Sequence, residues 1–309
     1  MYIEPKDLPY EQFPASPLLA EGMKTLNADL LPQHCMIDLN VEYAVKDGRH
    51  LRLQILRPGP RTDPRNDTLS ENFSFIMYVQ GSAWFEQALG LSIPMLLDFA
   101  RRGFVIAVVE YRPSTVAPFP AQIKDAKTAI RFMLKNASRY NVDGEKIIVW
   151  GDSSGGHTTS MVNVTLNDAE YTDEPNAPPL NVKAFVDYYG PSDISKMNEQ
   201  PSIQDHLIPE SPEGCLIGRV RVDEHPERVA PTIPMNHIKN WEKTRPQLII
   251  HGDKDRLVPF QQSVLLYNAL REAGSEVEFY KLAGADHGGP PFWTKEVLDI
   301  VESFIRKWI

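Results

Sequence analysis

Apolar residues gather in short continuous runs from about residue 72 onward, and each run has the length of a β-strand. Runs without regular polar alternation are typical of parallel strands that are buried on both faces of a sheet. We predict such strands over residues 73–81, 103–112, 147–151, 182–190 and 247–252. A further strand is expected over residues 277–284.

Between these strands, apolar positions recur at steps of three and four, which predicts amphipathic helices. One helix extends over residues 123–137, a second includes residues 264–270, and a third, over residues 297–308, ends the chain. Strands that alternate with helices in this way predict an α/β fold, with a mostly parallel sheet and helices on both of its faces.

Two segments depart from this alternation. Residues 36–58 contain two alternating runs around the turn sequence "KDG", which predicts an antiparallel hairpin at the start of the sheet. Residues 191–245 are rich in proline and too long for an ordinary connection, so we predict an insertion that covers the carboxyl ends of the strands like a cap. We expect residues 1–35 to form an N-terminal arm that contributes to this cap, and residues 36–309 to form the α/β domain.

The amino-acid composition and net charge limit which classes of partner the chain can bind. The 309 residues are 42% hydrophobic and 24% charged, as in soluble globular proteins. The formal net charge of −9 and the lack of a basic run argue against nucleic-acid binding. No run approaches the roughly 20 apolar residues of a membrane span. The first residues lack the basic and apolar parts of a secretory signal, so we expect a cytoplasmic protein without a membrane partner.

The two cysteines, Cys35 and Cys215, fit neither a metal-ligand spacing nor a disulfide framework. We expect them to be small buried apolar side chains. No metal ion or organic cofactor is predicted, and the sequence leaves open whether the chain forms a homo-oligomer.

The segment "GDSSGG", residues 151–156, has the pattern Gly-x-Ser-x-Gly between a predicted strand and a predicted helix. A sharp strand-to-helix turn of this kind lifts the hydroxyl of Ser153 above the sheet as a candidate nucleophile. Ser154 then places its amide at a helix N-terminus, where it can stabilise an anion. A phosphate-binding loop is disfavoured because no Gly-Lys pair follows, whereas a plain glycine-rich turn remains an alternative.

A serine nucleophile needs a base, and the base needs a group that orients it. His287 follows the last predicted strand and lies among small residues, so it is the candidate base. Two aspartates after the preceding strand, Asp253 and Asp255, compete for the orienting role. We expect His157 and His251 to be structural histidines near the site.

The remaining requirement is an oxyanion hole. The first buried strand ends in Gln80-Gly81-Ser82-Ala83, where small residues allow close approach of the backbone. The amides of Ser82 and Ala83 are candidates to join that of Ser154. Gly81 is expected to contact the substrate. Trp84 is expected either to form a wall of the acyl or leaving-group pocket or to pack against the cap.

Four sequence blocks together resemble the α/β-hydrolase superfamily, in particular the hormone-sensitive-lipase-like and feruloyl/acetyl-esterase-like carboxylesterases. They are the "GDSSGG" elbow, "YRPSTVAPFPAQIKDA" (111–126), "HGDKDRLVP" (251–259) and "DHGG" (286–289). The resemblance covers about residues 40–309 and implies the α/β-hydrolase fold, with Asp255 as the acid of a Ser-His-Asp triad. In place of the family's His-Gly-Gly this chain has Gln80-Gly81-Ser82, so the shape of the acyl pocket is not predicted.

The resemblance implies a serine esterase that cleaves carboxylic esters with short or aromatic acyl groups. Acetylated or feruloylated carbohydrates and small plant esters are the substrates it suggests. A peptidase or an arylformamidase on the same fold is the alternative. A catalytically inactive binding module is a third hypothesis, but it predicts the loss of a triad residue, and all three are present.

Overall fold

A computed structural model of the chain describes residues 2–9, 12–26, 34–59, 71–238 and 244–309. Parts of the predicted arm (residues 1, 10–11 and 27–33) and of the predicted insertion (residues 239–243) lie outside the described residues.

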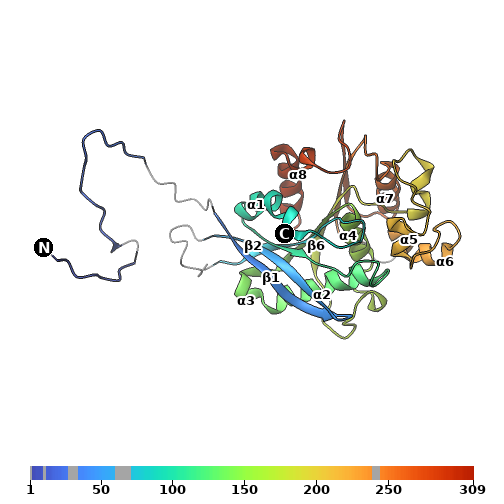
Figure 1. The fold of residues 1–309 in the computed structure, drawn as a ribbon, viewed down its shortest axis with the longest axis horizontal. Coiled ribbons are helices and arrows are strands. Elements are labelled where there is room, and N and C mark those ends of the chain that lie inside the picture. The colour runs from blue at the N-terminus through green and yellow to red at the C-terminus, as the bar shows by residue number, and fades with distance from the viewer. Residues whose placement is uncertain (1, 10–11, 27–33, 60–70, 239–243) are drawn as a thin grey trace.

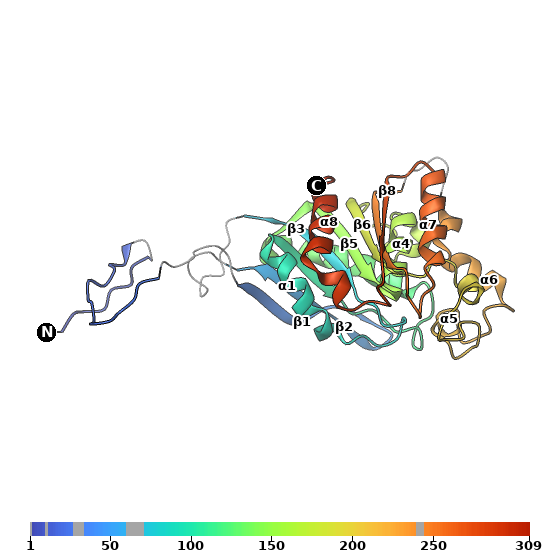
Figure 2. The same cartoon turned by 90° about the horizontal axis from the view of Figure 1, so that it is seen from above.

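The core is one eight-stranded sheet with the strand order β1-β2-β4-β3-β5-β6-β7-β8 (Figures 1 and 2). All neighbouring pairs from β4 to β8 are parallel, whereas β1 and β2 run antiparallel to their neighbours. This arrangement confirms the predicted strands. Their bounds are β1 Cys35–Lys46, β2 Arg49–Pro58, β3 Phe73–Val79, β4 Phe104–Val109, β5 Val142–Asp152, β6 Val182–Tyr188, β7 Gln247–Gly252 and β8 Val277–Leu282.

The predicted hairpin is formed by β1 and β2, which pair from Lys46↔Arg49 at the turn to Cys35↔Pro58, with two register shifts in β1. Asp47 and Gly48 both have positive φ there, as a tight hairpin turn requires. β2 then pairs with β4 and joins the hairpin to the parallel part of the sheet.

Helices cover both faces of the sheet, as predicted. The core on one face includes side chains of α1 (Ile93–Arg101) and α8 (Lys295–Arg306). The core on the other face includes side chains of α2 (Ala121–Lys135), α3 (Ala137–Tyr140) and α4 (Ser154–Val164). In Figure 1, α1 and α8 accordingly lie on the opposite side of the sheet from α2 and α3. α7 (Gln261–Glu272) packs on Ile249 of β7. The sequence patterns do not predict α1.

The insertion between β6 and β7 is here called the cap segment (residues 191–245). Its described residues, 191–238 and 244–245, contain only short helices. They are α5 (Pro212–Leu216), α6 (Pro226–Val229) and 3-10 turns over Ile194–Glu199, Ala230–Thr232 and Pro234–His237. The segment has a small apolar core of its own. Trp84, in the loop that follows β3 (here called the β3 loop), contributes to this core. The cap segment is therefore packed onto the loop that follows the first parallel strand.

The described residues of the N-terminal arm differ from expectation. Residues 2–9 and 12–26 are all exposed and extend away from the α/β domain (Figures 1 and 2). These residues bury no apolar surface against the cap segment, so they do not contribute to it in this structure. Within the described ranges, no helix is both long and apolar enough to cross a membrane.

Candidate active site

Ser153 occupies a strained turn between β5 and α4. Its φ of 53° and ψ of −126° are rare for a residue with a side chain. Two glycines make the turn sterically feasible. A Cβ on Gly151 would collide with the carbonyl of Gly155, and a Cβ on Gly155 would collide with the carbonyl of Val79. The backbone therefore holds the Ser153 hydroxyl above the carboxyl end of the sheet.

The structure brings Ser153, His287 and Asp255 together from three separate loops. His287 Nε2 lies 2.9 Å from Ser153 Oγ, and His287 Nδ1 lies 2.7 Å from Asp255 Oδ2. Because parallel strands end at one edge of the sheet, the loops after β5, β7 and β8 meet there. Both distances lie within the range expected of hydrogen bonds between catalytic groups.

Asp255 is held as an ionised acceptor. Its Oδ1 accepts the amides of Leu257 and Val258, both at 2.8 Å, and the side chain is fully buried. Burial acts to raise the pKa of this carboxyl, but hydrogen bonds from His251 and His287 outweigh it and hold the pKa well below its usual range. The carboxylate is therefore available to fix the imidazole of His287.

The competing residue, Asp253, has another position. Its Oδ1 accepts the amide of Gly284 at 2.6 Å, which ties the β7 loop to the β8 loop without reaching His287. His251 is buried and binds Ser263 Oγ at 2.7 Å through Nδ1. His157 contacts the carbonyl of Thr232 at 2.8 Å, and burial lowers its pKa to about 4. Both histidines have structural contacts near the site.

The β3 loop places two backbone amides beside Ser153. Ala83 and Trp84 both have φ of 55°, so the chain turns sharply under the cap segment. The structure differs from expectation at Ser82, whose amide donates to Ser154 Oγ at 2.9 Å and is not free. Among the described residues, the amides of Ala83 and Ser154 have no acceptor. These two amides are therefore free to donate to a group bound beside Ser153.

Gly81 binds the elbow and does not line the cavity beside Ser153. Its amide donates to Asp152 Oδ1 at 3.0 Å, and the same oxygen accepts the Tyr78 hydroxyl at 2.6 Å. A Cβ on Gly81 would approach Ser153 Cβ to 2.7 Å, closer than real side chains allow. Gly81 thus has a structural role, in which it lets the β3 loop approach the nucleophile, and its contact with a substrate stays a prediction.

Tyr111 also anchors the β3 loop, a role that the sequence pattern does not indicate. Its hydroxyl donates to the carbonyl of Gln80 at 3.0 Å and lies 2.8 Å from Ser82 Oγ. Burial raises the pKa of Tyr111 to about 12, so the phenol remains protonated at neutral pH. Gln80, which replaces the family's histidine, anchors the loop by donating from Nε2 to the carbonyl of Ala88 at 3.1 Å.

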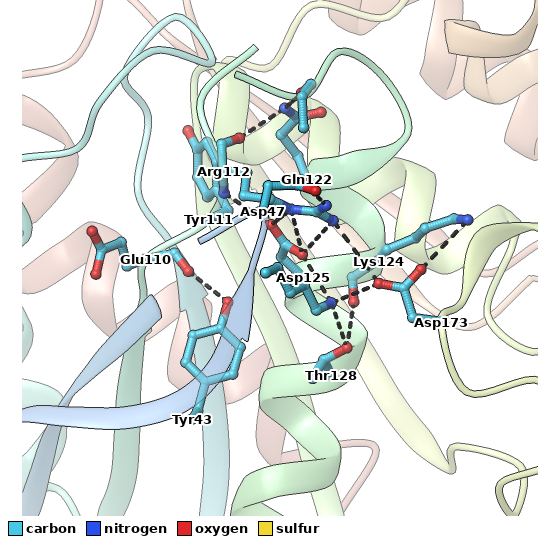
Figure 3. Close-up of polar contacts among 12 residues, drawn as sticks. Tyr43, Asp47, Glu110, Tyr111, Arg112, Gln122, Lys124, Asp125, Thr128 and Asp173 are labelled. Carbon is cyan, nitrogen blue, oxygen red and sulfur yellow. Dashed lines mark hydrogen bonds and ion pairs between the residues drawn. The ribbon is translucent and has the colours of Figure 1, made fainter. Parts of the chain in front are cut away.

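The loop that carries Tyr111 is fixed by a buried ion cluster around Asp125 of α2 (Figure 3). Asp125 is fully buried, and its Oδ1 lies 2.8 Å from Arg112 Nη2 and 2.9 Å from Lys46 Nζ. Asp125 Oδ2 also accepts the amide of Arg112 at 2.8 Å. Arg112 and Asp125 belong to the "YR…D" block of the sequence. Their function in this structure is to position the segment beside the elbow.

A small cavity of about 40 Å³ adjoins Ser153. Its walls include Ala83 and Trp84 of the β3 loop, and His206 and Glu213 of the cap segment. Trp84 is buried against the cap segment, as one of the two expectations has it, and it also lines this cavity. A larger depression of about 700 Å³ touches Asp255 but neither Ser153 nor His287.

The described residues contain no cluster of three or more His, Cys, Asp or Glu side chains suited to a metal ion. Both cysteines are free thiols. Cys215 is buried as expected, whereas Cys35 at the edge of the sheet is only half-buried.

Known proteins are similar to this chain in sequence and in architecture. The sequence model of the family named BD-FAE matches residues 64–270. The esterase LipC of Mycobacterium tuberculosis is 29% identical over 229 residues, which are 72% of this chain and 55% of LipC. The chain spans about half the length of the curated relatives it matches.

Solved structures are similar over more of the chain. A truncated carbohydrate esterase from the gut microbiota has a TM-score of 0.75 and 29% identity, covering 91% of this chain and 98% of that one. A bifunctional GH43-CE protein of Bacteroides eggerthii has a TM-score of 0.71 and 27% identity, covering 91% and 38%. Together with the eight-stranded sheet, these similarities confirm the predicted α/β-hydrolase fold.

Proposed function

The chain belongs to the BD-FAE family and has the α/β-hydrolase fold, and from this premise we propose that it is a serine esterase for short-chain carboxylic esters. The observation that carries the proposal is the hydrogen-bonded series Ser153–His287–Asp255, with distances of 2.9 and 2.7 Å. The same constellation of nucleophile, base and orienting acid supports acyl transfer on several unrelated folds.

In this proposal, Ser153 Oγ attacks the ester carbonyl while His287 Nε2 accepts the hydroxyl proton. Asp255 orients the imidazole and stabilises its charge when it is protonated. The amides of Ala83 and Ser154 stabilise the oxyanion, because both lie beside Ser153 without an acceptor of their own. His287 then protonates the leaving alcohol, and water hydrolyses the acyl-enzyme by the same route in reverse.

The small cavity supports a preference for short acyl groups. The cavity of about 40 Å³ is small beside the roughly 300–1,000 Å³ of typical ligand pockets, so it suits a short acyl group. This volume favours short over aromatic acyl groups. The carbohydrate esterase among the similar structures supports sugar esters as the alcohol component.

The test is a series of p-nitrophenyl esters from acetate to palmitate, assayed as monomers and above the micellar threshold. We expect kcat/KM to fall steeply with chain length, because the cavity beside Ser153 is small. We expect no rise at the threshold, because the described part of the cap segment has only short helices and no long amphipathic helix that could dock on a lipid surface. Faster turnover of emulsified long-chain ester than of butyrate would contradict the proposal.

A Ser153→Ala variant serves as the control for the chemistry. We expect kcat to fall by about 10⁴-fold or more. An organophosphonate should label the unmodified enzyme at Ser153, as mapped by mass spectrometry of the peptide. A label on Ser154 would reverse the assignment of the nucleophile.

A further inference from the structure

The cavity beside Ser153 ends at a buried polar group of the cap segment. Glu213 is 3% exposed, and its Oε1 lies 2.9 Å from Nδ1 of the buried His206. The other ring nitrogen of His206 lies 2.9 Å from Ser202 Oγ. Glu213 is thus held in one orientation by a chain of side-chain contacts within the cap segment.

Three polar atoms of the residues that line this cavity are buried without a partner among the described residues. Glu213 Oε2 is a hydrogen-bond acceptor, whereas Gln204 Nε2 and Trp84 Nε1 are donors. Native proteins pair nearly all buried polar atoms with protein groups, water or ligand. A buried acceptor and two buried donors on residues of one cavity therefore favour a partner there that can both donate and accept, either a water molecule or a group of the substrate.

A hydroxyl group meets this requirement. It can donate its proton to Glu213 Oε2 and accept a hydrogen bond from Trp84 Nε1 or Gln204 Nε2. An ammonium group has donors only and would face two unpaired N–H groups. A methyl group would leave all three polar atoms unpaired, which is costly in a buried site.

The position of the cavity identifies the part of the ester that enters it. The leaving alcohol departs on the side of His287, because His287 Nε2 must protonate it. The cavity contacts Ala83, Ser153 and Ser154, but His287 is not part of its wall. The cavity therefore lies on the acyl side of the reacting carbonyl.

We propose that Glu213, with Trp84 and Gln204, forms a hydroxyl-binding subsite that selects esters of short hydroxy acids, with the hydroxyl one or two carbons from the carbonyl. This inference rests on the proposed esterase function and specifies its acyl group. The carboxyl of Glu213 is the specificity-determining acceptor, and the small volume of the cavity, about 40 Å³, favours a short acyl group.

Phenyl glycolate and phenyl propionate test the proposal directly. Their acyl groups have the same number of heavy atoms, with a hydroxyl in place of a methyl, and the leaving group is identical. Each kcat/KM is divided by the rate constant of hydroxide-catalysed hydrolysis, which removes the difference in intrinsic reactivity. We expect a normalised preference for glycolate of about tenfold or more, the usual effect of pairing buried polar groups.

Other substrate outcomes are equally decisive. Equal normalised rates for the two esters would overturn the subsite while leaving the esterase function intact. Faster hydrolysis of phenyl glycinate than of phenyl glycolate would show that the cavity selects an ammonium group instead. Hydrolysis of neither glycolate nor propionate would instead contradict the esterase proposal itself.

Two variants test which residues cause the preference for glycolate. Glu213→Gln replaces the Oε2 acceptor with a donor, so the glycolate preference should fall below threefold. Trp84→Phe removes the indole N–H together with part of the ring, keeps an aromatic side chain and should lower the same ratio, which keeps the test available if the first variant does not fold. Glu210→Gln changes an exposed carboxylate of the same segment and should leave the ratio unchanged. If a folded Glu213→Gln variant kept the full preference for glycolate, Glu213 would not be the acceptor of the substrate hydroxyl.

Discussion

Ser153 and Ser154 are neighbours, but the structure assigns them different atoms of the site. Ser153 presents its hydroxyl to His287, whereas Ser154 has a free amide, the proposed oxyanion donor, and uses its hydroxyl to accept the Ser82 amide at 2.9 Å. The side chain of Ser154 thus anchors the β3 loop. Alanine at this position would keep the catalytic amide and lose only the anchor.

We therefore expect Ser154→Ala to lower kcat by about tenfold at most, because a neutral hydrogen bond contributes no more than about 1.5 kcal/mol. Steady-state kinetics with p-nitrophenyl acetate measures the effect. A loss as large as that of Ser153→Ala, in a variant with unchanged circular dichroism, would show that the Ser154 hydroxyl takes part in the chemistry.

The two aspartates of the β7 loop allow a matched comparison. Asp255→Asn should lower kcat by about 10⁴-fold, because an amide in place of the carboxylate favours the wrong tautomer of His287. Asp253→Asn should cost less than tenfold, since this side chain only accepts the Gly284 amide. If the Asp253 variant were the more impaired of two folded proteins, the assignment of the orienting acid would be wrong.

At the scale of secondary-structure elements, the cluster around Asp125 joins α2 to the hairpin and to the loop after β4 (Figure 3). Asp125→Asn leaves Arg112 and Lys46 without their buried counter-charge. We expect the free energy of unfolding to fall by about 3 kcal/mol or more, as when one partner of a buried ion pair is removed. Urea denaturation followed by tryptophan fluorescence measures the change.

Asp47→Asn is the control, because Asp47 binds the same arginine at 2.8 Å but its side chain is 56% exposed. An exposed ion pair contributes less than about 1 kcal/mol. Similar losses in the two variants would mean that burial of Asp125 has no special importance for the stability of these elements.

At the scale of the whole molecule, Asp187 makes stability depend on pH. Burial between β6 and α4 raises the pKa of this carboxyl to about 7, although Gly190 and Ser160 donate hydrogen bonds to it. The folded protein therefore keeps a proton that the unfolded chain releases near pH 4. Since the folded state binds more protons in this range, Asp187 lowers stability as the pH rises from about 4 to about 7.

Asp187→Asn resembles the protonated form and should remove this contribution. We expect the free energy of unfolding, measured by urea denaturation at several pH values, to gain most from the substitution at and above pH 7 and least near pH 4. Asp7→Asn, in the exposed arm, serves as the control. A difference from the unmodified protein that does not vary with pH would contradict the role of Asp187.

The sequence by itself determined the parts of this protein that depend on local pattern. Continuous apolar runs identified the buried parallel strands, because such strands need apolar side chains on both faces. The elbow around Ser153 was recognisable because only glycine fits beside so sharp a turn. The positions of His287 and Asp255 after predicted strands placed them at the correct edge of the sheet, since parallel strands end together.

Only the tertiary structure decided features that depend on contacts between distant residues. The Ser82 amide binds a hydroxyl 72 residues away, so a predicted oxyanion donor is already occupied. Gly81 and Tyr111 likewise have their functions through partners on other strands. The cap segment has no periodicity that predicts how it packs, and the cavity formed by Trp84 and Glu213 exists only once that packing is set. Side-chain pattern predicts secondary structure and its buried face, whereas the partner of each polar group depends on how the folded loops pack together.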